Sequence, residues 1–408
     1  MSHLSVGGEG VPKSRALLLT SLGHFINDGT LFLFPLLVDI VLSVKLFAPV
    51  FAAVFLTVFY IMGSAFSLVV GRAADRGFSL GKLIGLGLFL YPLGLLGFYF
   101  IIQYHVNSFP IVLVSTLLMG TASSFYHPLG ASVLQGSYGS GSTGTALGIN
   151  GAIGSVGRAL YPSLLFVVAA ALTLARSFLF FAALAAVAAV VIAAGLRNCC
   201  KQAETRGTRA KALRSSVATP LILLTILVFA RSVATQGIIS WIPVYLSNVK
   251  SLGLSDSLGY TLSLMFAGGI VGQPVFGYLT RKFDKRVLLS LTSFGTAVTI
   301  LGYINTTGME ALVMLGVFGF FTFSGFPLLF SIIQDYVQGT SSTVNSLVWG
   351  LGSQGGMAAG PAVVGLLALN DYSALTTSFY LMIALIFVVG TAFLFMPKSS
   401  TKKKMALF

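Results

Sequence analysis

The sequence has few charged residues, and very few of them are acidic. Only 8% of its 408 residues are charged, and ten of these are Asp or Glu. An ordinary soluble domain carries about 25% charged residues. Because 56% of the chain is hydrophobic, no single soluble core could bury its apolar side chains. We therefore expect most of them to contact lipid or other helices in a membrane.

Sequence signatures of catalysis and of disulfide cross-linking are also missing. The two cysteines, Cys199 and Cys200, are adjacent in a basic segment, which favours a reduced pair over a disulfide framework. The sequence has no G-x-x-x-x-G-K-[ST] nucleotide loop, no Ser nucleophile elbow and no Cys/His spacing for a metal. We predict a protein that is not an enzyme and has no cofactor, so that uphill transport would draw on an ion gradient.

Twelve apolar runs are present, each about 20 residues long or longer, which is enough to cross the hydrocarbon core of a bilayer as a helix. They lack the alternation of a membrane β-barrel, so an all-α membrane protein is predicted. The predicted spans are 16–42, 47–70, 83–104, 109–135, 144–171, 174–196, 217–247, 258–279, 288–306, 310–336, 342–369 and 373–396.

The basic residues predict the orientation. Nineteen Lys and Arg residues fall in the tails and loops on one side of the predicted spans, and three fall on the other. The positive-inside rule then puts both termini in the cytoplasm of a multi-pass protein of the cell membrane. The net charge of +14 is spread over short loops without a continuous basic face, so a nucleic-acid partner is not expected.

The chain divides into two similar halves. Its longest polar stretch, 197–216, separates a six-span half at 16–196 from another at 217–396, with cytoplasmic tails at 1–15 and 397–408. Gly and Pro positions recur between the halves, which indicates an internal repeat. At a shift of 199, the residues Gly120, Pro128, Gln135, Gly157 and Pro162 fall on Gly319, Pro327, Gln334, Gly356 and Pro361.

Three charged residues, Asp28, Arg158 and Arg231, lie deep within predicted spans. At a rise of 1.5 Å per residue, each lies about 20 Å from the cytoplasmic end of its span, close to the midplane. Charges at this depth are costly and are functional candidates. Asp28 could simply pair with one arginine and join the halves. Alternatively, the surplus positive charge binds an anion, since Arg matches carboxylate, phosphate and phosphonate.

Other polar and aromatic groups are candidates for the same region. His24 and Asp28 share a helix face and could couple transport to protons. His24, Asp28 and His127 have ligand types that suit a divalent metal, although the nearby arginines oppose a second cation. His127 is a candidate to bind substrate as well, and so are Asn27, Gln236, Trp241 and Trp349, with helix packing as the alternative for each.

The segment after the second span resembles the loop signature of the major facilitator superfamily. Residues 71–77 read GRAADRG, similar to the pattern G-x-x-x-D-R-x-G-R-K with the glycine one position early. The counterpart begins at Gly277 and has Arg281 where the acid usually stands. The resemblance implies a cytoplasmic latch between the halves and a central cavity lined by spans one and seven. The predicted latch residues are Gly71, Asp75, Arg76, Arg281 and Asp335.

Within the superfamily, the chain is most similar to the fosmidomycin resistance proteins. Span one reads GHFIND at 23–28, similar to S-H-x-x-N-D, and span four reads GTASSFYHP at 120–128, similar to G-x-x-S-x-x-H-P. Span ten ends in Gln334-Asp335, where that family has Gln-Glu. Span seven has Arg231 where that family has Lys. Arg158 has no counterpart in that family.

These observations predict a secondary active transporter that moves small organic anions by alternating access. Coupling to protons and efflux as an antiporter are part of this prediction. The alternatives are a drug/proton antiporter for cationic or neutral compounds, a divalent-metal transporter and a non-transporting sensor. The expected partners are an anionic small molecule, protons and the lipid bilayer, and the expected state is a monomer.

Overall fold

The structure is a computed structural model that describes residues 11–43, 50–139, 141–197, 215–252, 256–337, 341–368 and 373–398. Within these ranges, the chain folds into helices and contains no strand. The predicted linker 197–216 and the two predicted tails lie mostly outside them. The predicted all-α architecture is confirmed.

The N-terminal half contains six long helices. They are α1 (Lys13–Ser43), α2 (Val50–Asp75), α3 (Leu80–Tyr104), α4 (Phe109–Tyr138), α5 (Thr143–Ala171) and α6 (Leu174–Gly195). All follow the predicted spans to within a few residues, except that α2 continues to Asp75. Residues 71–75 of the signature segment are therefore the last turns of a helix and not part of a loop, which corrects the sequence-based expectation.

The C-terminal half has the same number of spans, but three of them are divided into more than one element. Its elements are α8 (Ser215–Val244), the π-helical η1 (Tyr245–Val249), α9 (Asp256–Leu279), α10 (Lys285–Asn305), α11 (Gly308–Phe323), α12 (Gly325–Val337), α13 (Ser342–Ser346), the π-helical η2 (Leu347–Gln354), α14 (Gly355–Leu367) and α15 (Ala374–Leu394). Span ten breaks at Ser324 because Pro327 lacks the N–H that would bond to Phe323, and its ring crowds that carbonyl.

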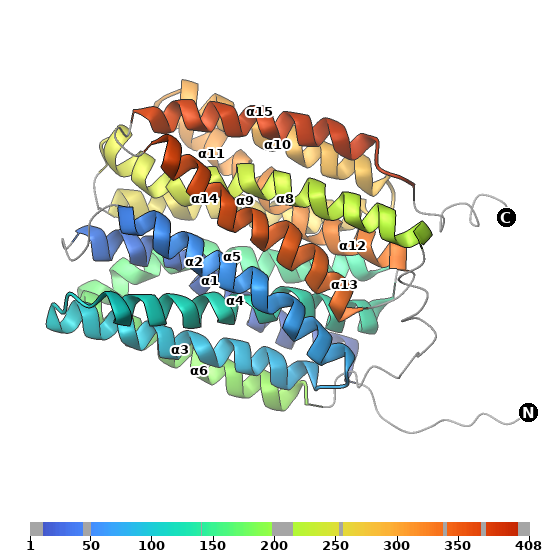
Figure 1. Ribbon diagram of the computed structural model, residues 1–408, viewed down its shortest axis with the longest axis horizontal. Coiled ribbons are helices and arrows are strands. Elements are labelled where there is room, and N and C mark those ends of the chain that lie inside the picture. The colour runs from blue at the N-terminus through green and yellow to red at the C-terminus, as the bar shows by residue number, and fades with distance from the viewer. Residues whose placement is uncertain are drawn as a thin grey trace, which may run out of the picture.

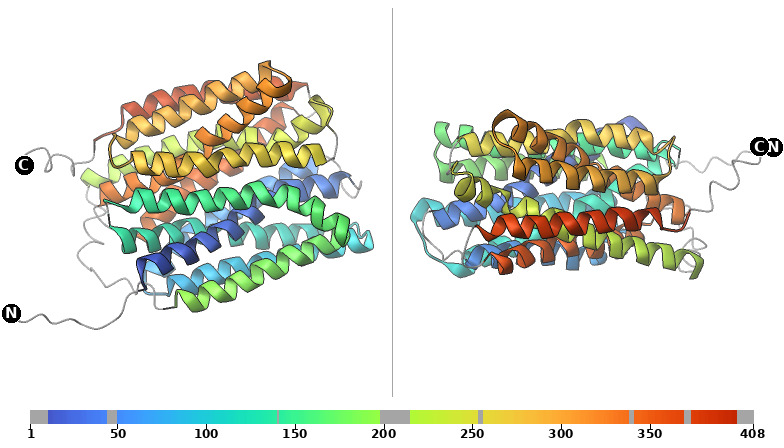
Figure 2. Two further views of the ribbon diagram at one scale, coloured as in Figure 1. Left: turned by 180° about the vertical axis from the view of Figure 1, so that it is seen from behind. Right: turned by 90° about the horizontal axis from the view of Figure 1, so that it is seen from above.

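The helices lie side by side along the long axis of the molecule (Figure 1). α3 and α6 pack together at one margin, and α10 and α15 pack at the other (Figure 1). Between these margins, α5 packs on α9 (Figure 2) and α2 packs on α14 (Figure 1), so these two pairs join the halves. Eleven helices among the described residues are long and apolar enough to cross a membrane.

The outer faces of the bundle are apolar. Val187 and Val190 on α6 are 63% and 66% exposed, and Val388 on α15 is 65% exposed. Contiguous apolar surface of this kind marks contact with an apolar environment. The structure thus supports a multi-pass membrane protein whose outer helices face lipid.

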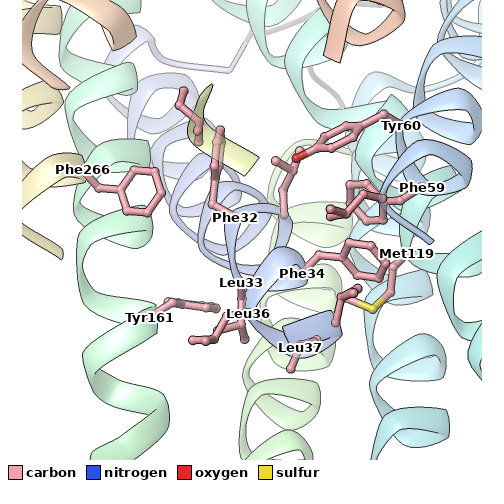
Figure 3. Close-up of a cluster of buried hydrophobic side chains, with 14 of the residues drawn as sticks. Phe32, Leu33, Phe34, Leu36, Leu37, Phe59, Tyr60, Met119, Tyr161 and Phe266 are labelled. Carbon is pink, nitrogen blue, oxygen red and sulfur yellow. The ribbon is translucent and has the colours of Figure 1, made fainter. Parts of the chain in front are cut away.

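Aromatic packing anchors α1 between the two halves. Phe34 of α1 stacks on Phe59 of α2 with ring centres 4.1 Å apart, inside the N-terminal half (Figure 3). Two residues earlier, Phe32 meets Phe266 of α9 from the other half at 5.3 Å (Figure 3). The segment of α1 that holds Asp28 therefore lies next to the boundary between the halves.

Candidate functional site

A cavity lies at the boundary between the halves. Its volume, measured as the space that the centre of a water molecule can occupy, is about 90 Å³. One water requires roughly 10–15 Å³ by the same measure, so the cavity has room for more than one. Its walls come from α1, α4 and α5 on one side and from α8, α10, α12, η2 and neighbouring elements on the other. Residues of both halves would therefore contact a bound solute.

The Asp28 carboxylate forms the polar centre beside this cavity. It is fully buried and forms an ion pair with Arg158 of α5 through Oδ2. His24 Nε2 lies 3.1 Å from the same oxygen, and His127 Nε2 of α4 lies 3.0 Å from Oδ1. Asn27 donates to Oδ1 at 3.0 Å. Four groups from three helices thus surround one carboxylate, as expected for a charge in a dry interior.

Outer contacts fix this Asp28 cluster in place. His24 Nδ1 lies 2.7 Å from Asn150 Oδ1, and Tyr91 donates to Asn27 at 3.1 Å. Glycines on α5 permit the close approach to α1. A side chain at Gly154 would collide with the His24 ring, and one at Gly157 would collide with the backbone of Phe25. Gly154 and Gly157 therefore serve close helix packing within the N-terminal half.

Arg231 is the second cation of the cavity and lies on the opposite side. Its Nε donates to Ser293 at 3.3 Å and its Nη2 donates to the Thr322 carbonyl at 3.1 Å. No carboxylate pairs with it in the part of the chain that the structure describes. Arg158 is neutralised by Asp28, so the charge of Arg231 is the uncompensated one.

Aromatic rings and unsatisfied polar atoms complete the walls. His127 stacks on Trp349 of η2, with ring centres 4.1 Å apart, and the Arg158 guanidinium lies 4.4 Å from the centre of the Phe323 ring. Three buried polar atoms of cavity residues lack a hydrogen-bond partner among the described residues: His127 Nδ1, Arg158 Nε and Trp349 Nε1. Such atoms are suited to bind a polar solute or water.

The structure brings most of the predicted binding residues to the cavity. His24, His127, Arg158, Arg231, Gln236 and Trp349 line it. Asn27 lies behind Asp28 and contacts Tyr91, and Trp241 donates to the Pro361 carbonyl at 3.0 Å, so neither belongs to the cavity wall. Gln236 also donates to Tyr60 of the other half at 2.8 Å.

Sequence reasoning missed several residues of this region. Phe32, Phe323 and Met357 form apolar parts of the cavity wall, but an apolar residue in an apolar span gives no signal of its own. Asp39 was missed for a different reason. It lies near the end of the first span, where an acid is usually hydrated, yet its Oδ2 is buried without a partner in the described ranges.

Three ligand atoms of the Asp28 cluster could in principle hold a metal ion. Atoms of His24, Asp28 and His127 all lie within 4.8 Å of one another. Arg158 is already paired with the same carboxylate, however, and a divalent cation would have to displace it or tolerate its charge. The donor set therefore suits a proton and an arginine better than a metal.

Asp75 connects the halves at the predicted cytoplasmic end. Its carboxylate accepts hydrogen bonds from the backbone N–H groups of Ser342 and Thr343, at 3.0 and 2.9 Å, where α13 begins. It also accepts from the Ser341 hydroxyl at 3.2 Å. An acid at a helix N-terminus is stabilised by the free N–H groups and by the helix dipole. Gly71 gives α2 the room to approach, because a side chain there would collide with Ser346.

The other predicted latch residues do not bridge the halves in the same way. Arg281 is exposed, and its guanidinium lies 5.8 Å from the centre of the Tyr278 ring of α9, in the same half of the molecule. Arg76 is exposed at the end of α2. Asp335 pairs with Lys285 at 2.6 Å within the C-terminal half. Gly277 does mirror Gly71, since α9 approaches α5 closely at Gly144 and Gly148.

Two six-helix halves around a central cavity that contains buried charged residues define a membrane transporter rather than an enzyme. The family model described as Major Facilitator Superfamily matches residues 17–354, and the chain belongs to this superfamily. The resemblance stated from the sequence motifs is thereby confirmed.

Relatives and solved structures agree with this assignment. The chain is similar to the fosmidomycin resistance protein of Escherichia coli (strain K12), with 26% identity over 309 residues that cover 72% of this chain and 73% of the relative. It is 32% identical over 99 residues to YitZ of Bacillus subtilis (strain 168), an uncharacterised MFS-type transporter, covering 23% of this chain and 60% of that one.

Two solved structures share the fold. The human organic anion transporter MFSD10 superposes with a TM-score of 0.66 at 16% identity, covering 93% of this chain and 99% of that one. The E. coli fucose:proton symporter FucP superposes with a TM-score of 0.63 at 15% identity, covering 93% and 98%.

Proposed function

We propose that this protein is a secondary active transporter of small organic anions, coupled to protons through Asp28 and His24. The observation that carries the proposal is Arg231, a cation that lines the central cavity and has no carboxylate partner among the described residues. A buried positive charge is costly at membrane depth unless a counter-charge joins it. A carboxylate, phosphate or phosphonate would supply that charge and fit the guanidinium fork.

Arg158 supports the same substrate class from the opposite half. It lines the cavity, and its Nε lacks a partner within the described part of the chain. An anion between Arg158 and Arg231 would contact both halves, so that its binding favours the arrangement in which both arginines are close. This is the coupling that alternating access between two halves requires.

The alternative of a drug/proton antiporter for cationic compounds depends on Asp28. That carboxylate does not line the cavity and already has four partners. A cation would have to displace Arg158 to reach it. The relative named as a fosmidomycin resistance protein is consistent with efflux.

The substrate class can be tested by thermal stabilisation of the purified full chain. A ligand that binds the folded state raises its melting temperature with concentration. We expect benzoate, phenylphosphonate or malonate to stabilise the protein and tetraphenylphosphonium to leave the melting temperature unchanged. Stabilisation by the cation alone would contradict the proposal and favour the antiporter for cationic drugs.

A further inference from the structure

The α8 side of the cavity is polar. Four polar residues of this helix line the cavity: Arg231, Ser232, Thr235 and Gln236. Arg231 and Thr235 are four residues apart, so they share a face of the helix. The guanidinium of Arg231 and the hydroxyls of Ser232 and Thr235 can all donate hydrogen bonds to a carboxylate. We therefore expect the charged end of a solute to lie against α8.

Arg231 keeps one end of its guanidinium available for this charged group. Its Nε donates to Ser293 and its Nη2 donates to the Thr322 carbonyl. Its Nη1 has no hydrogen-bond partner among the described residues. A Cβ atom at Gly325, another residue of the cavity wall, would lie 3.1 Å from Nη1. Because Gly325 has no side chain, Nη1 stays accessible to a solute.

The cavity can compensate one negative charge, but not two. Arg158 also lines it, but this arginine is paired with Asp28, and its guanidinium lies 4.4 Å from the centre of the Phe323 ring. The charge of Arg231 is left, because arginine stays protonated in proteins. Charges at this depth are poorly screened, so a second negative charge on the solute would lack a counter-charge. A monoanion therefore fits the cavity better than a dianion.

Other parts of the cavity wall are aromatic. Five Phe and Trp rings line the cavity, from α1, α11, α12, η2 and α15: Phe32, Phe323, Phe326, Trp349 and Phe393. Phe326 lies edge-on to Trp349, with ring centres 6.2 Å apart and planes at 88°. Phe32 lies edge-on to Phe323 in the same way, at 5.9 Å and 89°. Aromatic rings prefer edge-on or offset contact with one another, so a further flat ring would find favourable partners here.

The volume of the cavity limits the size of the solute. About 90 Å³ corresponds to about six to nine water molecules by the measure used above. A single six-membered ring with one carboxylate fills a space of this size. A solute with several rings would require the two halves to move apart.

We infer that the transported anion has a single negative charge and one flat aromatic ring, with benzoate as its simplest example. Its charged group binds to Arg231 and Thr235, and its ring lies against Phe326 and Trp349. The inference rests on the proposed function and narrows its substrate class. It assigns the selection of charge to α8 and the selection of shape to the aromatic rings.

The test compares four anions by thermal stabilisation of the purified full chain at neutral pH. Benzoate and cyclohexanecarboxylate have the same charge and nearly the same size, but only benzoate is flat. Phthalate and malonate have two charges, with and without a ring. We expect the Kd of benzoate to be about two- to tenfold below that of cyclohexanecarboxylate, because aromatic pairs add this much beyond the buried area. The two dianions should bind about tenfold more weakly than benzoate, or worse.

Two outcomes of this comparison have different meanings. If cyclohexanecarboxylate, phthalate or malonate binds as tightly as benzoate or more tightly, the inference is overturned, while the proposed transport of anions stands. If none of the four anions stabilises the protein, the proposed function fails, and the inference fails with it.

Two substitutions separate the ring end of the site from the charged end. Phe326→Leu should abolish the preference for benzoate over cyclohexanecarboxylate. Thr235→Val keeps the shape of the side chain but loses the hydroxyl, so it should weaken both anions alike, by about two- to tenfold, and leave their ratio unchanged. Phe89→Leu, whose ring is 47% exposed on α3, is the matched control and should change neither value. A preference that persists in both Phe326→Leu and Phe323→Leu would overturn the inference.

Discussion

His127 and Trp349 stack face to face across the boundary between the halves, with ring centres 4.1 Å apart and planes 20° from parallel. The stack can persist only while the two halves keep their present relation. The fluorescence of Trp349 should therefore report changes in the cavity and in the relation of the two halves. In Trp241→Phe it is the only tryptophan left in the chain. We expect anion binding to change its emission, and an anion that stabilises the protein without such a change would place binding elsewhere.

The role of Arg231 can be tested by keeping its charge while removing its planar fork. We expect Arg231→Lys to weaken anion binding about tenfold or more, and Arg231→Gln to weaken it further, because hydrogen bonds to charged groups contribute about 1.5–3 kcal/mol. Titration by thermal stabilisation measures both. Arg176→Gln, an exposed arginine at the other end of the bundle, is the control. Unchanged affinity in folded Arg231→Gln would exclude the proposed anion site.

Asp75 is expected to hold the predicted cytoplasmic end closed. Asp75→Ala removes the acceptor of two backbone N–H groups and should lower the free energy of unfolding by about 1 kcal/mol. It should also increase thiol labelling of a cysteine placed at Ser132, which contacts Ser342 behind this latch. Gly141→Ala, at a site with open space around it, is the control. Equal labelling in both variants would show that Asp75 does not hold this end closed.

Substitution of Asp39 is expected to raise the free energy of unfolding, whereas substitution of Asp75 lowers it. Asp39 Oδ2 is buried and has no hydrogen-bond partner among the described residues, which costs free energy in the folded state. We expect Asp39→Asn to raise the free energy of unfolding by about 1 kcal/mol, since the amide removes the charge and adds donors. Thermal unfolding of the purified protein measures this. A loss of transport together with a gain in stability would show that Asp39 is kept for function.

Both termini and the linker 197–216 are predicted to be cytoplasmic, and labelling of the native cysteines can test this orientation. Cys199 and Cys200 are its only cysteines and lie in that linker. A membrane-impermeant thiol reagent should label inverted vesicles and leave intact cells unlabelled. Labelling of intact cells would reverse the orientation derived from the basic residues.

The fold could be predicted almost completely from the sequence, because span length and charge placement are direct consequences of the bilayer. The interruptions were harder to predict. Pro327 marks the internal repeat, and its missing N–H also breaks span ten. Nothing in the segment 347–354 distinguishes a π-helix from the α-helix that its composition favours, since packing around the cavity decides the register.

The candidate site was predictable where charge marked it. Asp28, Arg158 and Arg231 stand out in apolar spans, and their common depth indicated one shared region. Depth alone could not predict which of the two arginines pairs with Asp28. Asp28 pairs with Arg158 because Gly154 and Gly157 bring α5 against α1 on that face. Similarly, Trp241 and Trp349 look alike in sequence, and only the helix rotation directs one to the cavity and the other to Pro361.

The two ends of the pseudo-symmetric repeat are not equal, since Asp75 stands in one half and Arg281 in the other. A single carboxylate, that of Asp75, therefore joins the halves at this end, where a symmetric repeat would provide two. When this end opens, the three hydrogen bonds that Asp75 accepts must break together, with no second acid in the other half to keep part of the contact.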